Sequence, residues 1–347
     1  MITAQADGLR ELGTRIFHAQ GAPKKKASFV AETLVEGNLT GHDSHGVQYF
    51  VTYSDRIREG FIDVKADPRI DKETPTTALV DGQWAFGQVT AMRAMETAVA
   101  KARRSMVAAV GAYNCNHIGR LGYYNTWAAS QGVIGMMFVN VGNPNVTGYN
   151  IQGRAFGTNP VSVSTPTGRE TPFLMDYATS IVAHGKVSVA RAKHEKIPTG
   201  WVRDKYGRVT DDPNVMWDGG WLLPFGEYKG YGLQMVSELL GAALTGSRLG
   251  LEESRRPPSP NGVFIVAVNP EAFVGLDAFE ERVGRLVSWV KGFQPEAGKT
   301  VLVPGEPEAI SKEKRLREGI PIPEDTWAAI VKLCGELGID PGIALKK

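Results

Sequence analysis

The hydrophobic pattern of the chain changes between residues 60 and 76, and this change limits the possible folds more than any other feature. In the first 60 residues, apolar side chains such as Val30 and Leu34 recur at helical spacing. From about residue 76, strand-like runs alternate with helical stretches. The strand-like runs are TALVDG, MVAAVGAY and VIGMMFVNV, and the helical stretches are QVTAMRAMETAVAKARRS and GRLGYYNTWAASQG. We therefore expect an α/β (α+β) fold that follows a helical N-terminal segment.

The second half of the chain gives weaker signals. We expect helices to start near Thr179, Lys229 and Ala278. Residues 252–262 are polar and Pro-rich, which is typical of a surface loop. The chain ends in a basic helix and a last amphipathic helix.

Length and composition are those of a globular protein with more than one domain. The chain has 347 residues, of which 42% are hydrophobic and 22% charged, and its net charge is +2. So small a charge argues against nucleic acid as the main partner. Cys115 and Cys334 form neither a CxxC pair nor a zinc pattern, which favours a cytoplasmic setting. The start of the chain lacks a signal-peptide pattern and residues 132–142, the longest apolar stretch, are too short to span a bilayer, so we expect no membrane segment.

Three common nucleotide and hydrolase motifs are absent. No GxGxxG follows a strand-like run, so the sequence does not support a standard Rossmann dinucleotide site. The GKT at residues 298–300 lacks the glycine spacing of a P-loop, and no GxSxG nucleophile elbow occurs.

The segment GHDSHGVQYF, residues 41–50, contains residue types that suit three chemistries: nucleophilic hydrolysis, metal binding and proton transfer. It lies between two expected helices, where Asp43 or Ser44 could cap the second. A nucleophilic Ser44 would need an elbow and an oxyanion loop that the sequence does not offer. A turn does not hold His42 and His45 as a zincin helix holds its histidines, so we expect no metal. A histidine here can also donate a proton.

Four polar segments each lie at the end of an expected helix or strand. They are DSHG, NHIGRLGYY, FGTNPVSV and LMDYATSIVAHGK. In the second, His117, Gly119 and Arg120 lie where a strand turns into a helix, and such a turn favours a phosphate. In the fourth, Thr179 and Ser180 are placed to cap a helix. Each segment alone is explained by caps and turns, but ligands of α/β proteins gather at such ends, so together they predict one shared site.

Five motifs of the chain, in their order and spacing, resemble those of one known family, the second malate/L-lactate dehydrogenase family. They are GHDSHGV, HIGRLGYY, FGTNP, MDYATS and EYKGYGL. Ureidoglycolate and sulfolactate dehydrogenases belong to this family. DGQWAFGQV, with PGE at 304–306 and GIP at 319–321, is most similar to its hydroxycarboxylate dehydrogenase B branch. The resemblance covers about residues 5 to 340.

The resemblance implies a fold and an assembly. It implies a non-Rossmann NAD(P)-binding domain with a mixed, largely antiparallel sheet, and a helical domain built from the N- and C-terminal segments. We expect the helical domain at residues 1–74 with 303–347, and the NAD(P)-binding and substrate domain at residues 75–302. The family also implies a homodimer.

The resemblance further implies the reaction and its proton donor. Members interconvert 2-oxo acids and 2-hydroxy acids by hydride transfer with NAD or NADP. The histidine of their SHG motif donates the proton and matches His45, with Ser44 and Asp176 as a relay. A histidine can give and take a proton near neutral pH, and a carboxylate behind it would favour the imidazolium form. His117 is the second candidate for the base.

Further residues match contacts of the family. The expected cofactor contacts are His117, Ile118, Gly119, Arg120, Leu121, Tyr177, Ala178, Thr179, Ser180, Lys229, Gly230 and Arg315. The expected substrate contacts are Tyr49, Arg120 and Thr158. The sequence does not distinguish NAD from NADP, since no Rossmann acidic residue is available to contact the ribose.

One position departs from the family. Many members carry an arginine four residues after the catalytic histidine, suited to hold a carboxylate by two hydrogen bonds. Here that residue is Tyr49. We expect either that Arg120 replaces the missing arginine or that Tyr49 favours a larger or aromatic substrate. Two other functions stay open: reduction of cyclic imino acids such as piperideine- or pyrroline-2-carboxylate, and non-enzymatic binding on the same fold.

Overall fold

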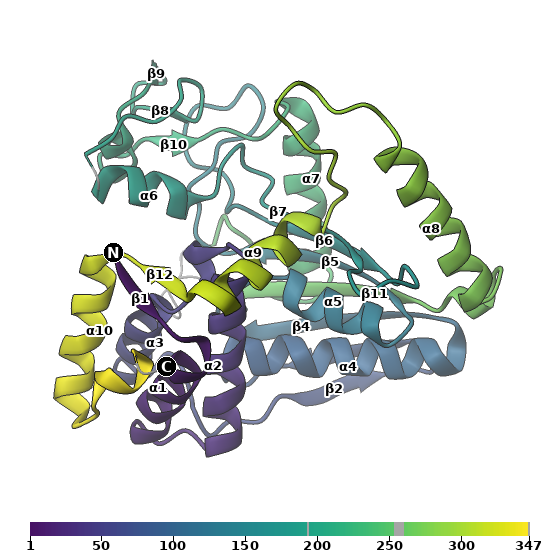
Figure 1. The fold of residues 1–347 in the computed structure, drawn as a ribbon, viewed down its shortest axis with the longest axis horizontal. Coiled ribbons are helices and arrows are strands. Elements are labelled where there is room, and N and C mark those ends of the chain that lie inside the picture. The colour runs from purple at the N-terminus through teal and green to yellow at the C-terminus, as the bar shows by residue number, and fades with distance from the viewer. Residues whose placement is uncertain (193, 253–259, 346–347) are drawn as a thin grey trace.

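The structure is a computed structural model that describes residues 1–192, 194–252 and 260–345 (Figure 1). Its buried apolar side chains form three clusters. One lies among helices from both ends of the chain, one between the main sheet and two helices, and a smaller one around short strands between residues 146 and 222. Among the described helices, none is long and apolar enough to cross a bilayer.

The two ends of the chain build one helical body. β1 (Ile2–Ala4) pairs antiparallel with β12 (Ile320–Ile322), so hydrogen bonds join the N-terminal to the C-terminal segment. The helices of this body are α1 (Ala6–Ala19), α2 (Lys24–Leu39), α3 (Tyr49–Arg58), α9 (Glu306–Glu318) and α10 (Glu324–Leu337). Helical spacing brings Leu9, Leu12 and Ile16 of α1 to one buried face. The expectation of helix from the first residue is wrong, because β1 precedes α1.

The main sheet has seven strands in the order β2-β3-β4-β11-β5-β6-β7. β3 and β4 run parallel, and the other neighbouring pairs are antiparallel. The strands are β2 (Arg69–Glu73), β3 (Thr77–Asp81), β4 (Val107–Cys115), β5 (Ile134–Val141), β6 (Val161–Thr165), β7 (Phe173–Tyr177) and β11 (Asn261–Val268). This arrangement confirms the expected mixed, largely antiparallel sheet.

The central strand of the sheet was not expected from the sequence. β11 lies between β4 and β5 and buries Val263, Ile265 and Ala267 completely. The predicted loop at residues 252–262 therefore extends too far, since Asn261 already pairs with both neighbouring strands. Residues 253–259 of that loop lie outside the described residues.

Helices cover both faces of the sheet (Figure 1). On one face α4 (Gly87–Ser105) and α5 (Gly122–Ser130) pack together, and on the other lies α7 (Tyr228–Glu238), which continues into a π-helical turn at Leu239–Ala243. α8 (Leu276–Lys291) stands at the far end of the molecule. The starts of α7 and α8 agree with the expected ones to within two residues.

A smaller unit of short elements lies above the helical body in Figure 1. It contains α6 (His184–Ala192) and the three-stranded sheet of β8 (Val202–Arg203), β9 (Val209–Thr210) and β10 (Trp221–Leu222). The expected helix start near Thr179 is wrong, because Thr179 Oγ1 donates to the Thr158 carbonyl at 2.9 Å instead of capping a helix. α6 begins five residues later, at His184.

The domain bounds at residues 75 and 303 stay a prediction. β2, which precedes residue 75, pairs with β3 and so belongs to the main sheet by its hydrogen bonds. α9, which follows residue 303, packs against α2 of the helical body.

Candidate functional site

The DSHG segment forms a tight turn between α2 and α3. Gly41 has a φ of +85°, which favours glycine, and Asp43–His45 form one turn of 3₁₀ helix. The residue before α3 is Gln48, and no side chain caps that helix end. The expected cap by Asp43 or Ser44 is therefore wrong, and both side chains are engaged elsewhere.

Within this turn Ser44 and His45 form a hydrogen-bonded pair. Ser44 Oγ lies 3.0 Å from His45 Nδ1, and Gln48 Nε2 donates to the Ser44 carbonyl at 2.7 Å. A Cβ on Gly46 would lie 2.1 Å from Asn38 Oδ1, so a larger residue there would displace the Asn38 side chain. The turn is thus held by its own neighbours, and no described residue hydrogen-bonds to His45 Nε2.

Helix α9 fixes the turn from outside. Arg315 holds Asp43 with both terminal nitrogens, at 2.5 and 3.0 Å. Arg315 also donates to the Asn38 carbonyl, and Ser311 Oγ donates to the Leu39 carbonyl at 2.9 Å. These are carbonyls of the last turn of α2, which lack partners within the helix. Arg315, an expected cofactor contact, is therefore used to join α9, α2 and the turn.

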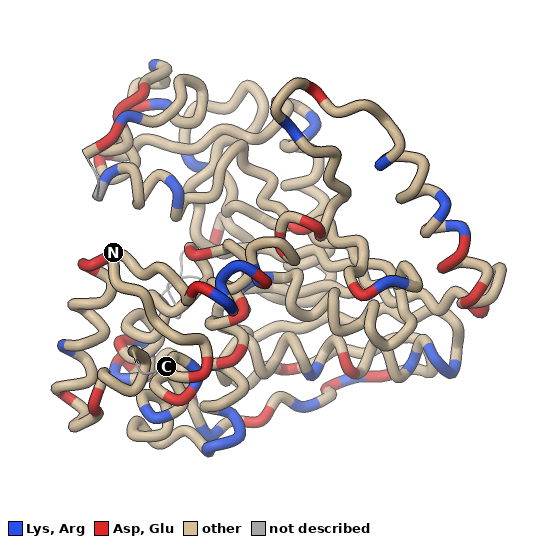
Figure 2. The backbone as a smooth tube through the Cα atoms, viewed as in Figure 1, with Lys and Arg blue, Asp and Glu red and all other residues tan. Residues whose placement is uncertain are grey.

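The neighbouring histidine also contacts α9. His42 Nε2 lies 3.1 Å from Glu308 Oε1. The carboxyl of Glu308 has a lowered pKa, since the effect of burial is outweighed by the hydrogen bond with His42 and by nearby positive charge. Figure 2 shows acidic and basic residues side by side along α9, where it crosses this part of the molecule.

The second histidine-bearing turn follows β4 and precedes α5. His117 Nδ1 lies 2.7 Å from Tyr53 Oη, and Gln88 Nε2 donates to the same hydroxyl at 2.8 Å. Tyr53 comes from α3 and Gln88 from α4, and both are buried. The helical body and the sheet thus meet at His117.

The two turns bring their imidazole rings together. The rings of His45 and His117 are stacked, with centroids 5.7 Å apart and an interplanar angle of 17°. The Tyr49 ring stacks on His117 at 4.6 Å and 14°. Segments 72 residues apart in the sequence, 45 and 117, therefore share one site.

Both imidazoles have lowered pKa values. Burial, assisted by the charges of His42 and Arg120, lowers the pKa of His45 to about 4. Burial also lowers the pKa of His117 well below its ordinary value, with contributions from His45 and Arg56. At neutral pH both rings are therefore uncharged in the protein without ligands.

Asp176 on β7 was expected in a relay with Ser44 and His45, and its recorded contacts are with other residues. Its Oδ2 accepts a 2.7 Å hydrogen bond from the Gly122 backbone and lies 3.4 Å from Arg120 Nε. Burial raises the pKa of this carboxyl, and the Arg120 charge opposes that rise. Among the described residues no hydrogen bond joins Asp176 to Ser44 or His45. Ser44 Oγ is the recorded partner of His45 Nδ1, and a relay role for Asp176 stays a prediction.

Arg120 is almost fully buried, with an exposed fraction of 7%. Its Nη1 donates to Thr40 Oγ1 at 2.9 Å, while Nε and Nη2 have no hydrogen-bond partner among the described residues. A buried guanidinium with unsatisfied N–H groups favours an anion beside it. Arg120 thus keeps two nitrogens for a further acceptor, close enough to His45 to lower its pKa.

Several expected cofactor contacts are used by the fold itself. Ile118 and Leu121 are buried in the central core, and the Ile118 backbone N–H donates to Asn261 at 3.0 Å. Thr179 is fully buried, and Ser180 Oγ donates to the Val182 carbonyl at 2.8 Å. Packing and internal hydrogen bonds explain these four side chains.

Other expected contacts remain accessible. Tyr177 is 41% exposed, and Lys229 at the start of α7 is exposed and has no ion-pair partner among the described residues. Ala178 and Thr158 are partly exposed, while Gly230 is buried. Gly119 has a φ of +75° and open space on the side where a Cβ would lie, apart from Gln88 at 3.6 Å.

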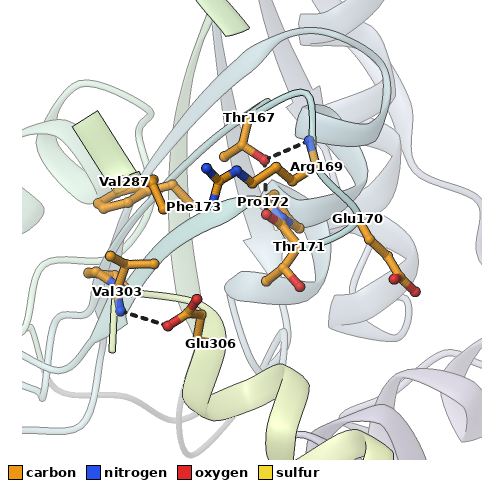
Figure 3. Close-up of a pocket in the computed structure, with 10 residues that line it drawn as sticks. Thr167, Arg169, Glu170, Thr171, Pro172, Phe173, Val287, Val303 and Glu306 are labelled. Carbon is orange, nitrogen blue, oxygen red and sulfur yellow. Dashed lines mark hydrogen bonds between the residues drawn. The ribbon is translucent and has the colours of Figure 1, made fainter. Parts of the chain in front are cut away.

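No metal centre is evident in residues 1–192, 194–252 and 260–345, where no three His, Cys, Asp or Glu side chains could hold an ion. A cavity of about 180 Å³ lies between the connection of β6 to β7 and the start of α9, where Arg169 and Glu306 border it (Figure 3). None of the expected site residues lines that cavity, so we do not assign it to the site.

Some site residues were not expected from the sequence. Tyr53 follows Tyr49 by four positions on α3, so helical spacing could have placed it on the same face. Thr40 and Glu308 belong to no motif, and Gln88 lies in the DGQWAFGQV stretch but was given no role. They reach the site only through tertiary packing, which a single sequence does not reveal.

Comparison with known proteins places this geometry in a family. The malate/L-lactate dehydrogenase family model matches residues 4–331. Hydroxycarboxylate dehydrogenase B of Escherichia coli K12 is 35% identical over 93% of this chain and 91% of its own length. The solved structure of sulfolactate dehydrogenase from Methanocaldococcus jannaschii superposes with a TM-score of 0.91 at 33% identity, covering 99% of this chain and all of that one.

A relative with another named activity is also similar. The Delta(1)-pyrroline-2-carboxylate/Delta(1)-piperideine-2-carboxylate reductase of Pseudomonas putida is 30% identical over 94% of this chain and 95% of its own length. The match of the family model over nearly the whole chain and the names of its relatives agree with the motif resemblance. The chain belongs to the malate/L-lactate dehydrogenase family and is an oxidoreductase that acts on hydroxy acids.

Proposed function

We propose that the site catalyses the interconversion of a 2-oxo acid and a 2-hydroxy acid with His45 as the group that gives and takes the proton. One observation carries this assignment: His45 and His117 are stacked, hydroxyls hold both Nδ1 atoms, and no described residue hydrogen-bonds to either Nε2. Two ring nitrogens therefore remain for one substrate. The reaction takes up a hydride and a proton in one direction and releases them in the other.

The charge state of His45 favours one direction in the free protein. Because burial lowers its pKa to about 4, the ring is neutral at pH 7 and can accept the proton of a 2-hydroxy acid at once. Reduction of a 2-oxo acid needs the imidazolium form. An anionic substrate beside the ring raises the His45 pKa and so supports that form.

We propose that Arg120 supplies the positive charge for the substrate carboxylate and that Tyr49 lines the substrate side. Arg120 supports this because its Nη2 has no hydrogen-bond partner among the described residues and its Nε has only the 3.4 Å ion pair with Asp176, and so does the stacking of Tyr49 on His117. Thr158, partly exposed, is a further contact in the proposal.

The test is to restore the family arginine. Tyr49→Arg adds a guanidinium that can hold a carboxylate by two hydrogen bonds. It should lower KM for small 2-oxo acids such as pyruvate about tenfold and raise it for aromatic ones. Tyr49→Phe, which keeps the ring, serves as control. An unchanged KM in Tyr49→Arg together with an unchanged KM in Arg120→Lys would contradict the proposed carboxylate site.

A nicotinamide cofactor fits the residues around this site. The exposed, unpaired ammonium of Lys229 suits a phosphate group, and Tyr177, Ala178, Gly119 and Gly230 would line the path of the cofactor. Bound there, a reduced nicotinamide supplies the hydride. We propose NAD or NADP, a homodimer and a cytoplasmic location.

The assay that tests the proposed function follows NADH and NADPH absorbance with a panel of 2-oxo acids. We expect turnover with at least one 2-oxo acid and reversal with the matching 2-hydroxy acid. Turnover confined to piperideine- or pyrroline-2-carboxylate would instead support the imine reductase, which the relative from Pseudomonas putida makes the second candidate. No cofactor binding at all would support a non-enzymatic role.

A further inference from the structure

A buried hydrogen-bond chain lies behind His117, and the proposed function does not use it. The chain runs from Gln88 on α4 through Tyr53 on α3 to His117 Nδ1, with distances of 2.8 and 2.7 Å. The exposed fractions of Gln88 and Tyr53 are 0% and 1%. Gln88 and Tyr53 are therefore shielded from water, and the Tyr53 hydroxyl finds its partners within the chain.

The order of the donors favours one arrangement of the hydrogens. Gln88 Nε2 can only donate, so Tyr53 Oη accepts that hydrogen bond. The single hydrogen of the Tyr53 hydroxyl is then available for an acceptor. His117 Nδ1 at 2.7 Å is closer than the His117 carbonyl at 3.3 Å. The shorter contact favours Nδ1 as the acceptor, which places the hydrogen of the neutral ring on Nε2.

Burial excludes the other ionisation states of the chain. Burial raises the pKa of the Tyr53 hydroxyl far above its ordinary value, so Tyr53 stays a donor throughout the physiological range. Burial likewise keeps His117 uncharged. His45 differs in its Nδ1 partner, which is a serine hydroxyl that can rotate between donating and accepting.

We propose that Tyr53, oriented by Gln88, is a positioning residue that holds His117 as the neutral Nε2–H tautomer and so makes it a permanent hydrogen-bond donor beside His45. This inference rests on the proposed function for its purpose: the His117 donor polarises the substrate oxygen, and His45 moves the proton. The two imidazoles then have separate tasks. His117 donates a hydrogen bond and never exchanges its proton, and His45 exchanges its proton in each turnover.

The tautomer can be measured without any activity. In wild-type protein labelled with ¹⁵N-histidine, the side-chain nitrogen spectrum near pH 7 should show Nδ1 of His117 as the unprotonated nitrogen and Nε2 as the protonated one. The His117→Gln variant identifies the signals, since the sequence has six histidines. A protonated Nδ1 in the wild-type spectrum would overturn the proposal.

Tyr53→Phe tests whether the hydroxyl is the cause. Its hydrogen bond stabilises the neutral ring, so its loss should raise the His117 pKa by up to about one pH unit and shift the Nδ1 signal to that of a nitrogen without a hydrogen bond. If Tyr53 were an acceptor instead, the pKa would fall. An unchanged Nδ1 signal and pKa would reduce Tyr53 to a packing role and overturn the proposal.

Tyr124→Phe is the matched control. Tyr124 is equally buried, and its hydroxyl donates to the Ile118 carbonyl, one residue from His117. This variant also loses a buried tyrosine hydroxyl near the same turn. It should keep the wild-type His117 tautomer and pKa. A shift in Tyr124→Phe as large as that in Tyr53→Phe would show a general effect of packing and would contradict the proposal.

Gln88→Met supplies a second variant if Tyr53→Phe fails to fold. Methionine has a similar length and removes Gln88 Oε1, which is buried without a partner, so a stable protein is expected. Without the Gln88 donor the orientation of the Tyr53 hydroxyl is no longer restricted, so it donates to Nδ1 in some molecules and accepts from it in others. The spectrum should then show a mixture of tautomers. A pure wild-type pattern would contradict the role given to Gln88.

Kinetics separate this inference from the proposed function. Tyr53→Phe should lower kcat/KM for a 2-oxo acid about tenfold, since one hydrogen bond loses its orientation, and leave KM for the cofactor unchanged. A wild-type protein with the expected tautomer but no 2-oxo acid turnover would contradict the proposed function alone. Normal turnover with the opposite tautomer would contradict this inference alone.

Discussion

The two histidine-bearing turns contain the same side chain in two different settings. The turn of His45 joins two helices, and the hydrogen bonds of Ser44 and His45 are to residues close in sequence. The turn of His117 ends a strand of the sheet, and its histidine is held by buried residues of two other helices. A ring whose Nδ1 lies against a serine hydroxyl, which can both donate and accept, suits proton exchange. A ring held by buried partners suits a fixed donor.

Of the two histidines, replacement of His45 should lower kcat/KM more. His45→Ala removes the proton donor and should lower kcat/KM for 2-oxo acid reduction by about 10²–10⁴-fold. The measurement is the initial rate of NADH or NADPH oxidation. His18→Ala is the control, because His18 contacts the Ala22 carbonyl within the helical body and should leave the rate unchanged. A His45→Ala enzyme within threefold of wild type would remove His45 from the mechanism.

Replacement of His117 should lower kcat/KM less than replacement of His45. His117→Ala removes one neutral hydrogen-bond donor, and a loss of about tenfold in kcat/KM is expected. His117→Gln keeps an N–H donor and should recover part of the rate. If His117→Ala lost more activity than His45→Ala, the roles of the two turns would have to be exchanged.

Loss of the contact between α9 and the His45 turn should have a smaller effect, which should appear as a lower free energy of unfolding. Arg315→Met removes the paired hydrogen bonds to Asp43 and the bond to the Asn38 carbonyl, so the free energy of unfolding should fall by about 1–2 kcal/mol. Urea denaturation measures it. Arg317→Met is the matched control on the same helix, since Arg317 is exposed and pairs only with Glu318 among the described residues. Equal losses in both variants would show that Arg315 has no special role.

The sequence predicted the motifs of the site well, because those motifs are local. DSHG and HIGRL each form one turn, and both turns lie where expected, at the ends of α2 and β4. The stacking of His45 on His117 agrees with the expected shared site. The sheet was predicted as mixed and largely antiparallel only through the family resemblance, and that expectation is confirmed.

Partners distant in sequence could not be predicted in the same way. Asp176 was expected behind His45, but the structure joins it to Arg120 and the Gly122 backbone. Asp43 was expected as a helix cap, and it pairs instead with Arg315, 272 residues away. Polar residues at turns have several possible partners, and tertiary packing selects among them. β11 was missed for a related reason, since its pairing partners lie on distant strands.

The pH dependence of kcat/KM for oxidation of a 2-hydroxy acid tests the central claim most directly. Oxidation requires neutral His45, and kcat/KM reports the free protein. Because the pKa of His45 is lowered to about 4, the rate should stay constant from pH 8 to about pH 5 and fall only as the pH approaches 4. Reduction, which requires the imidazolium, should rise over the same interval as the pH falls. An acid limb of oxidation at the ordinary histidine pKa of about 6.5 that persists in His45→Ala would contradict the assignment of His45.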